Sequence, residues 1–261
     1  MHPMLNIAVR AARRAGTIIL RSQARMDTVK VDSKGRRDYV STTDQTAEAA
    51  IIDTLIKAYP DHEILAEESG SGGKSDYVWI IDPLDGTTNY LHTYPQFAVS
   101  IALAVKGQVE QAVVYDPLRD ELFTATRGAG AQLNDRKLRV SRCRTLDSAL
   151  LATGFPVHNE SMIDPCLKSF GAFLHRADDV RQAGAACLDL AYVAAGRLDG
   201  YWEYALKPWE LAAGVLIVSE AGGMVGPIDE HQTLLATGHV LAATPRIFDE
   251  MRGILLAHPV A

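Results

Sequence analysis

Two carboxylates three residues apart, Asp82 and Asp85, directly follow a continuous apolar run in this 261-residue chain. The run, residues 77–81, is typical of a strand buried on both faces, and open α/β folds place ligand sites where such strands end. Gly86 leaves room for a ligand beside the backbone, and residues 87–89 can open a short helix whose free N–H groups face an anion. Carboxylates beside an anion site suit Mg²⁺ bound together with a substrate phosphate. The motif also makes a good β-turn, so on its own it leaves both interpretations open.

Further acidic residues lie at the predicted ends of neighbouring elements. Glu67 and Glu68 follow a predicted short strand, and Asp44 lies at the start of a predicted helix. The two glutamates could instead be a solvated pair on a loop, and Asp44 could cap its helix. Capping does not exclude catalysis, because a carboxylate held at a helix start can also orient a water.

Clustered carboxylates favour hydrolysis of a phosphate monoester only when cations accompany them. The doubly negative ester repels a nucleophile, and bound Mg²⁺ reverses the sign of the local charge. One ion then lowers the pKa of a bound water while another stabilises the leaving oxygen. The scattered histidines, His62, His92 and His158, form no group with ligand spacing. These residues predict a metal-dependent phosphomonoesterase that needs neither a Cys nor a His nucleophile.

Composition limits the possible classes of function. The net charge of −6 gives no electrostatic reason to expect direct nucleic-acid binding, although it excludes neither a local basic patch nor a protein partner. The widely spaced Cys143, Cys166 and Cys187 suggest neither a disulfide framework nor a zinc site, and fit a reducing cytoplasm. The arginine-interrupted N-terminal stretch favours an amphipathic helix over an export signal. Because no apolar run approaches the roughly 18 residues of a membrane span, we expect a cytoplasmic protein without a membrane contact.

The predicted elements alternate along the chain. The first half is expected to hold helices at 3–25 and 43–58, a short strand at 63–65, the buried strand at 77–81 and an antiparallel meander over 97–140. The second half is expected to hold strands at 150–152, 179–182, 201–203 and 239–243, and helices at 162–175, 185–195, 208–221 and 245–256. A polar segment with turn formers is expected at 32–37 and a mobile loop at 70–73. This order favours an α/β or α+β protein of stacked sheet and helix layers.

Two stretches, residues 82–89 and 209–223, resemble the signature motifs of the inositol monophosphatase family. Glu67, Glu68 and the stretch ending in Asp44 match other acidic elements of that family, and the similarity runs from end to end. It implies a layered α-β-α-β-α sandwich forming a single domain over residues 1–261, with a metal-binding half (1–145) and a half that completes the site (146–261). Residues 1–8 and 188–197 resemble the bacterial extragenic-suppressor branch, which is associated with transcription of ribosomal RNA.

The resemblance also implies a site, residue by residue. Glu67, Asp82 and the Leu84 carbonyl would bind the first Mg²⁺; Asp82, Asp85 and Glu210 the second; and Glu67 with water a weaker third, with Mn²⁺ a possible substitute. Thr87, hydrogen-bonded to Asp44, would position the attacking water, while the Gly86 and Thr87 N–H groups hold the phosphate. Asp85, Gly184, Ala186 and Glu203 would line the alcohol side of the substrate. A homodimer and inhibition by Li⁺ are further implications.

One position departs from the family pattern, which normally has Asp where this chain has Glu210. The extra methylene moves the carboxylate by roughly 1.5 Å, whereas Mg²⁺ requires near-ideal distances to its ligands. Either Glu210 reaches the ion through another rotamer or a bridging water, or the second site is weak and catalysis is slow or prefers Mn²⁺. The family also places an arginine at Arg181 near a subunit contact, which favours a structural salt bridge there over a catalytic role.

The predicted activity is hydrolysis of inositol 1-phosphate or a similar small polyol phosphate. Other substrates, such as a nucleotide 3′-phosphate or fructose 1,6-bisphosphate, are alternatives that the compact length and the position of Glu203 disfavour. The alternative from another class is a transcription antitermination partner of RNA polymerase and Nus factors whose phosphatase activity is weak or incidental.

Overall fold

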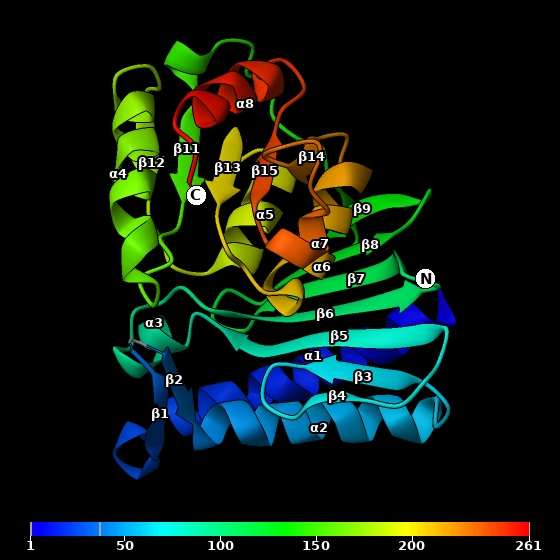
Figure 1. Ribbon diagram of the computed structural model, residues 1–261. Helices are drawn as coiled ribbons and strands as arrows, with labels where there is room; N and C mark the ends of the chain where they lie inside the picture. Colours follow the sequence, from blue (N-terminus) through cyan, green and yellow to red (C-terminus); the bar gives the residue numbers. More distant parts are fainter. Residues whose placement is uncertain (1, 37, 261) are drawn as a thin grey trace.

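Three helix layers alternate with two large β-sheets, of eight and five strands, which gives the expected α-β-α-β-α order and confirms the mixed α/β class (Figure 1). The computed structural model describes residues 2–36 and 38–260; Met1, in the opening stretch, and Arg37, in the polar segment, lie outside it. None of the described helices is long and apolar enough to cross a membrane.

Helices α1 (Pro3–Gln23) and α2 (Thr42–Ala58) form the first layer, on one face of the larger sheet. Proline at the first helical position and the His2 side chain, which accepts from the Met4 N–H, fix the start of α1. Small residues on its buried face let it pack closely, and a Cβ on Gly16 would lie only 2.6 Å from the Tyr115 ring. The first layer therefore packs closely on the larger sheet, with α1 against β7 (Gln108–Asp116) at this point.

The larger sheet has eight strands in the order β10-β9-β8-β7-β6-β5-β3-β4. In chain order they are β3 (Glu63–Ala66), β4 (Gly70–Gly72), β5 (Tyr77–Asp85), β6 (Ala98–Val105), β7 (Gln108–Asp116), β8 (Glu121–Thr126), β9 (Gly130–Leu133) and β10 (Arg136–Lys137). β6 to β10 form the predicted antiparallel meander, and β5 pairs antiparallel with β6. β3 and β5 run parallel, so that their C-terminal ends lie side by side. This parallel pair brings the two acidic motifs together.

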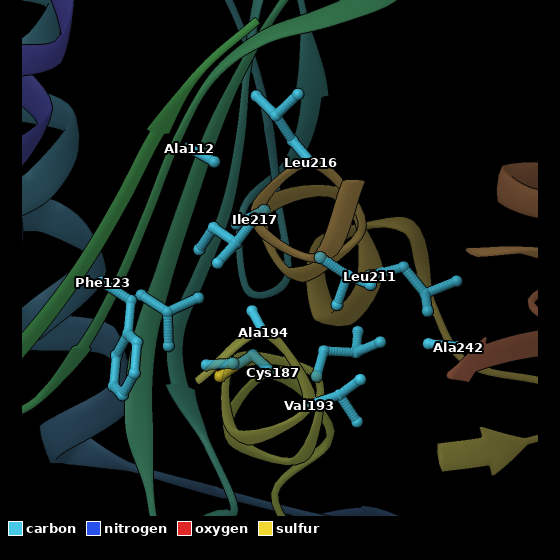
Figure 2. Packing of buried hydrophobic residues seen from close by; sticks show 14 of the residues in the cluster. Ala112, Phe123, Cys187, Val193, Ala194, Leu211, Leu216, Ile217 and Ala242 are labelled. Carbon is cyan, nitrogen blue, oxygen red and sulfur yellow. The ribbon is translucent and has the colours of Figure 1, made fainter. Parts of the chain in front are cut away.

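The smaller sheet has the order β12-β11-β13-β15-β14. Its strands are β11 (Leu150–Thr153), β12 (Asp179–Arg181), β13 (Gly200–Glu203), β14 (Met224–Pro227) and β15 (Val240–Ala243). Helices α5 (Ala186–Ala194) and α6 (Pro208–Glu220) fill the space between the two sheets, where Cys187, Val193 and Ile217 pack among apolar residues (Figure 2). Helices α4 (Glu160–Leu174) and α8 (Phe248–Ala257) cover the outer face; the short α3 (Thr87–Leu91) and α7 (Leu234–Thr237) complete the fold.

Three predicted segments differ from the structure. Residues 32–35 of the polar segment expected at 32–37 belong to β1 (Val31–Gly35) of the β1–β2 hairpin, in which β1 pairs antiparallel with β2 (Asp38–Ser41). Every residue of β1 is exposed, so no apolar alternation marked it. Residues 70–72, expected within a loop, pair with β3 as β4. β5 was expected to end at Ile81, but it continues through the acidic motif to Asp85.

Candidate functional site

The acidic motif lies in a bulge of β5 rather than beyond its end. The pairing of β5 with β6 shifts register between Asp82 and Asp85, where Pro83 has no N–H to donate to a neighbouring strand. Asp82 and Leu84 are buried, and the Leu84 N–H donates to Asp82 Oδ1 at 3.0 Å. The bulge therefore fixes the Asp82 carboxylate near the C-terminal end of β5 and changes the direction of the side chains that follow it.

Glu67 lies beside this bulge because β3 runs parallel to β5. Its N–H donates to the Ile81 carbonyl at 3.2 Å. The buried Glu48 carboxylate accepts the N–H groups of Glu68 and Ser69, each at 2.8 Å, and so fixes the turn. Glu67 and Glu68 are thus not a solvated loop pair, since their side chains are only 20% and 9% exposed.

Lys34, from the β1–β2 hairpin, reaches both glutamates. Its Nζ lies 3.0 Å from Glu67 Oε1 and 2.7 Å from Glu68 Oε1. Sequence reasoning missed this residue, since a lysine on an exposed polar hairpin carries no local sign that it faces a distant pair of carboxylates. In the described structure, the positively charged side chain of Lys34 therefore pairs with the acidic residues at the end of β3.

Asp44 and Thr87 meet as predicted. Thr87 Oγ1 lies 3.0 Å from Asp44 Oδ1 and 3.0 Å from the Leu84 carbonyl oxygen. The other oxygen of Asp44 accepts the Ser41 N–H at 2.8 Å within the capping box of α2. Asp44 is fully buried, so the one carboxylate both caps its helix and holds Thr87.

Gly86 and Asn89 join the motif to the second half of the chain. Gly86 has φ +89°, and a Cβ there would lie 2.9 Å from the Gln96 carbonyl oxygen and 3.2 Å from that of Gly184. Asn89 Nδ2 donates to the carbonyls of Gln96 (2.7 Å) and Ala183 (2.8 Å), with that of Gly184 at 3.1 Å. Only glycine fits at position 86, and Asn89 fixes the segment that leads into α5.

Two further carboxylates are held by backbone N–H groups at helix starts. The Cys187 N–H, in the first turn of α5, donates to Asp85 Oδ2 at 2.7 Å. The Lys207 N–H, just before α6, donates to Glu210 Oε2 at 2.6 Å. A carboxylate is stabilised at a helix N-terminus by the dipole and the free N–H groups. One oxygen of Glu210 is thus engaged by its own helix.

Glu203 faces the same space from the end of β13. The Tyr201 hydroxyl donates to Glu203 Oε2, and Tyr201 is fully buried. A Cβ on Gly154 would lie 2.1 Å from Glu203 Oε1, so the carboxylate packs directly on the Gly154 backbone. Tyr201 and Gly154, which the sequence did not single out, fix the orientation of Glu203.

The carboxyl groups of the site are buried close to one another, and both the burial and the neighbouring negative charges raise their pKa values. Burial, together with the nearby charge of Glu67, raises the pKa of Asp82 well above its usual range. Burial raises the pKa of Glu67 to about 7 despite the neighbouring Lys34. Burial and the charge of Asp85 raise the pKa of Glu210 to about 8. Buried carboxylates that repel one another in this way mark a place where an added cation is stabilised.

The donor set fits Mg²⁺, which takes carboxylate and carbonyl oxygens together with water. Within residues 2–36 and 38–260, no three His, Cys, Asp or Glu side chains converge tightly enough to hold an ion. The contacts above account for this: Glu67 is turned to Lys34, and Glu210 to the Lys207 N–H. The cleft therefore holds enough negatively charged oxygen ligands for a metal ion, but Glu67 and Glu210 each contact another group of the protein.

A single cleft of about 840 Å³ joins these groups. All the predicted site residues line it except Asp44, which lies behind Thr87: Glu67, Asp82, Leu84, Asp85, Gly86, Thr87, Gly184, Ala186, Glu203 and Glu210. Arg181 stands apart, in an exposed ion pair with Asp179 on the same strand, which agrees with the salt bridge expected there. The sequence therefore located the acidic site, and missed Lys34, Tyr201 and Gly154 around it.

The chain is similar to known proteins over nearly its whole length. The family model described as the inositol monophosphatase family matches residues 1–257. A relative from Escherichia coli K12, called Nus factor SuhB, is 51% identical over 253 residues, which are 96% of this chain and 95% of that protein. A crystal structure of the extragenic suppressor protein suhB from Bartonella henselae has a TM-score of 0.94 at 42% identity, covering 97% of this chain and 98% of that one. The inositol monophosphatase from Anabaena sp. PCC 7120 has a TM-score of 0.84 at 39% identity, covering 98% and 96%.

Proposed function

Because the chain belongs to the inositol monophosphatase family, we propose that it is a Mg²⁺-dependent phosphatase that hydrolyses inositol 1-phosphate or a similar small polyol phosphate. The observation that carries this proposal is the meeting of Glu67, Asp82, Asp85 and Glu210 in one cleft with the Asp44–Thr87 pair. A cleft with this many carboxylates repels a phosphate ester unless cations are bound, so a phosphatase function of this cleft requires bound metal ions.

The proposed oxygen donors to two or three ions are Glu67, Asp82, Asp85, Glu210 and the Leu84 carbonyl. Bound Mg²⁺ supplies a water of lowered pKa and neutralises charge on the phosphate and leaving oxygen. Mn²⁺ is a possible substitute, and Li⁺ inhibition follows if the site that includes Glu210 is complete.

The chain's own residues then orient the reactants. Thr87 Oγ1, which can donate to Asp44, keeps lone pairs that can accept from the attacking water. The backbone N–H groups of Gly86 and Thr87 are proposed to hold the phosphate. Glu203 is proposed to accept a hydroxyl of the substrate, since Tyr201 engages its Oε2 and leaves Oε1 for other contacts. Asp85, Gly184 and Ala186 are proposed to line the same alcohol side.

A phosphate-release assay tests this function. We expect wild type to hydrolyse inositol 1-phosphate with Mg²⁺, and to lose activity with a chelator. Asp85→Asn keeps the shape of the side chain and removes a charged donor, so turnover should fall at least a hundredfold, a loss of about 2.7 kcal/mol or more. Turnover that is changed neither by the chelator nor by Asp85→Asn would contradict the proposed Mg²⁺-dependent phosphatase function.

A second candidate function comes from the relatives' names, since the Escherichia coli and Pseudomonas aeruginosa relatives are called Nus factor SuhB. We propose that this chain also contacts the transcription machinery in the cytoplasm, through RNA polymerase or Nus factors, and that it is a homodimer. Co-purification with RNA polymerase that Asp85→Asn leaves unchanged would support a binding role independent of catalysis. Loss of co-purification in Asp85→Asn would show that the two roles share the site, and absence of any complex would remove this candidate.

A further inference from the structure

The densest run of positive charge in the chain lies far along the sequence from the acidic motifs. Residues 136–144, here called the basic strap, contain Arg136, Lys137, Arg139, Arg142 and Arg144 and no acidic residue, in a chain of net charge −6. All five side chains are exposed. The strap leaves the edge of the eight-stranded sheet at β10 and leads toward β11 of the other sheet (Figure 1).

The backbone of the basic strap is anchored along its length. The Leu138 N–H donates to the Ala131 carbonyl at 2.8 Å, and the Val140 N–H donates to the Ala221 carbonyl at 3.2 Å. The Ser141 hydroxyl donates to Asp199. Leu138 is buried between the exposed Lys137 and Arg139. The charged side chains are therefore presented by a fixed backbone rather than by a free loop.

The charges of the basic strap have no counterpart within the described part of the chain. None of its five cations forms an ion pair there; Arg139 donates instead to the Leu138 carbonyl at 2.8 Å. The nearby carboxylates serve backbone N–H groups: Asp199 accepts that of Leu150, and Glu220 accepts those of Gly128 and Gly130. Five uncompensated cations side by side repel one another, so an anionic partner would stabilise them.

Helix ends explain part of this charge. A Cβ on Gly196, just beyond α5, would lie 3.0 Å from the Ser141 nitrogen. Ala221, whose carbonyl accepts the Val140 N–H, is the C-cap residue of α6. Cations near a helix C-terminus add about 0.3–1 kcal/mol of stability each. That role predicts a loss of stability when the charges are removed, and it predicts no binding of an anion.

We propose that the basic strap binds the phosphate backbone of a nucleic acid. Four of its five cations are arginines, whose planar fork pairs with phosphate through two hydrogen bonds. The strap carries no aromatic residue and no exposed large apolar residue, so it lacks both the anchors of a protein interface and a platform for base stacking. Contacts limited to phosphates make binding independent of base sequence. This binding is separate from the proposed phosphatase function and does not depend on it.

Fluorescence anisotropy with fluorescein-labelled oligo(U) tests the proposal on the full chain. Five phosphate contacts on a single strand give a slope of about −3.5 for log affinity against log salt, a loss of about a hundredfold between about 50 and 200 mM. Arg139→Gln/Arg142→Gln/Arg144→Gln removes three of the contacts. We expect that variant to lower the affinity at low salt at least tenfold and to reduce the slope by about 2.

A charge-matched control is available on α1 and just beyond it. Arg10→Gln/Arg21→Gln/Arg25→Gln removes three exposed cations that form no ion pair in the described structure, and it takes the net charge from −6 to −9 as the strap variant does. We expect the control to bind oligo(U) within about threefold of wild type, and oligo(A) to bind the wild type equally well. Phosphatase activity and melting temperature, measured beside it, show that each variant is folded.

Four results would overturn the proposal. Wild type could fail to bind oligo(U) at low salt, or the two triple variants could lose affinity equally. A strap variant that melts at a lower temperature yet retains oligo(U) binding would leave only the helix-end role. Binding of polyglutamate at the strap without binding of oligo(U) would assign the surface to an acidic protein segment instead.

Discussion

At the scale of single residues, the site depends on carboxylates whose neighbours hold them in place. Glu203 shows this most clearly, since its carboxylate packs on Gly154 and accepts from the Tyr201 hydroxyl. Glu210 is the residue that departs from the family pattern, and one of its oxygens already binds the Lys207 N–H. These two positions give opposite predictions, one for damage and one for improvement.

Gly154→Ala should damage recognition of the alcohol part of the substrate. Its Cβ would meet Glu203 Oε1 at 2.1 Å, so the carboxylate has to move. We expect KM for inositol 1-phosphate to rise about tenfold, about 1.4 kcal/mol, with little change in the hydrolysis of p-nitrophenyl phosphate. Gly171→Ala is the control, because nothing lies within 4 Å of its added Cβ. Equal effects on both substrates would show that Glu203 does not contact the alcohol.

Glu210→Asp should improve metal binding. The shorter side chain leaves the Lys207 N–H and restores the family's residue, so the Mg²⁺ concentration for half-maximal activity should fall up to about tenfold. A titration of activity with Mg²⁺ measures this, with Glu220→Asp as control, since Glu220 lies at the other end of α6 and binds Gly128 and Gly130. An unchanged or weaker Mg²⁺ response would show that Glu210 already serves as well as Asp.

At the scale of elements, the site is assembled by joints between segments far apart in the chain. Asn89 is the joint between α3 and the segment before α5, through the carbonyls of Gln96, Ala183 and Gly184. The start of α5 in turn holds Asp85 through the Cys187 N–H. Loosening Asn89 should therefore affect both stability and catalysis.

Asn89→Asp is nearly isosteric, but it replaces the donating amide with a carboxylate facing three carbonyl oxygens. We expect the free energy of unfolding, measured with urea, to fall by about 1–3 kcal/mol, and kcat/KM for inositol 1-phosphate to fall with it. Asn134→Asp is the comparison, since the Asn134 amide donates only to the exposed Asp120 carbonyl. Equal losses of stability in the two variants would contradict the role of Asn89 as a joint.

Elements with a strong local pattern were predictable from the sequence. The apolar run before Asp82, the alternation of the meander and the proline at the start of α6 each carry a local signal, and all three elements are present. The β1–β2 hairpin was missed because its first strand is wholly exposed, and Lys34 was missed with it. The contacts of Glu203 and Asp85 depend on strand pairing and helix placement, which no short stretch of sequence encodes.

At the scale of the whole molecule, the same crowding of carboxylates affects folding. Glu67 and Glu210 have pKa values raised to about 7 and about 8 in the folded chain, against a usual value of 4.5. Between about pH 4.5 and these raised pKa values, the two carboxyl groups are ionised in the unfolded chain but still protonated in the folded chain. Stability therefore falls as pH rises through this window, by up to about 1.4 kcal/mol per pH unit for each group.

We expect the metal-free protein to melt at progressively lower temperatures from about pH 5 to about pH 8. Glu210→Gln, which cannot ionise, should flatten that decline, and Mg²⁺ should raise the melting temperature most at the alkaline end, because it binds the ionised form. Differential scanning fluorimetry across this range measures both. A melting temperature that rises with pH in the absence of metal would contradict the crowding of these carboxylates.

The proposed phosphatase activity requires that this cleft bind metal ions. Anomalous scattering from a crystal soaked in Mn²⁺ measures that binding at the site itself. We predict one peak beside Glu67, Asp82 and the Leu84 carbonyl, and a second, weaker peak between Asp85 and Glu210. A map with no anomalous peak in the cleft, at a Mn²⁺ concentration at which the same preparation is active as a phosphatase, would contradict metal binding in the cleft.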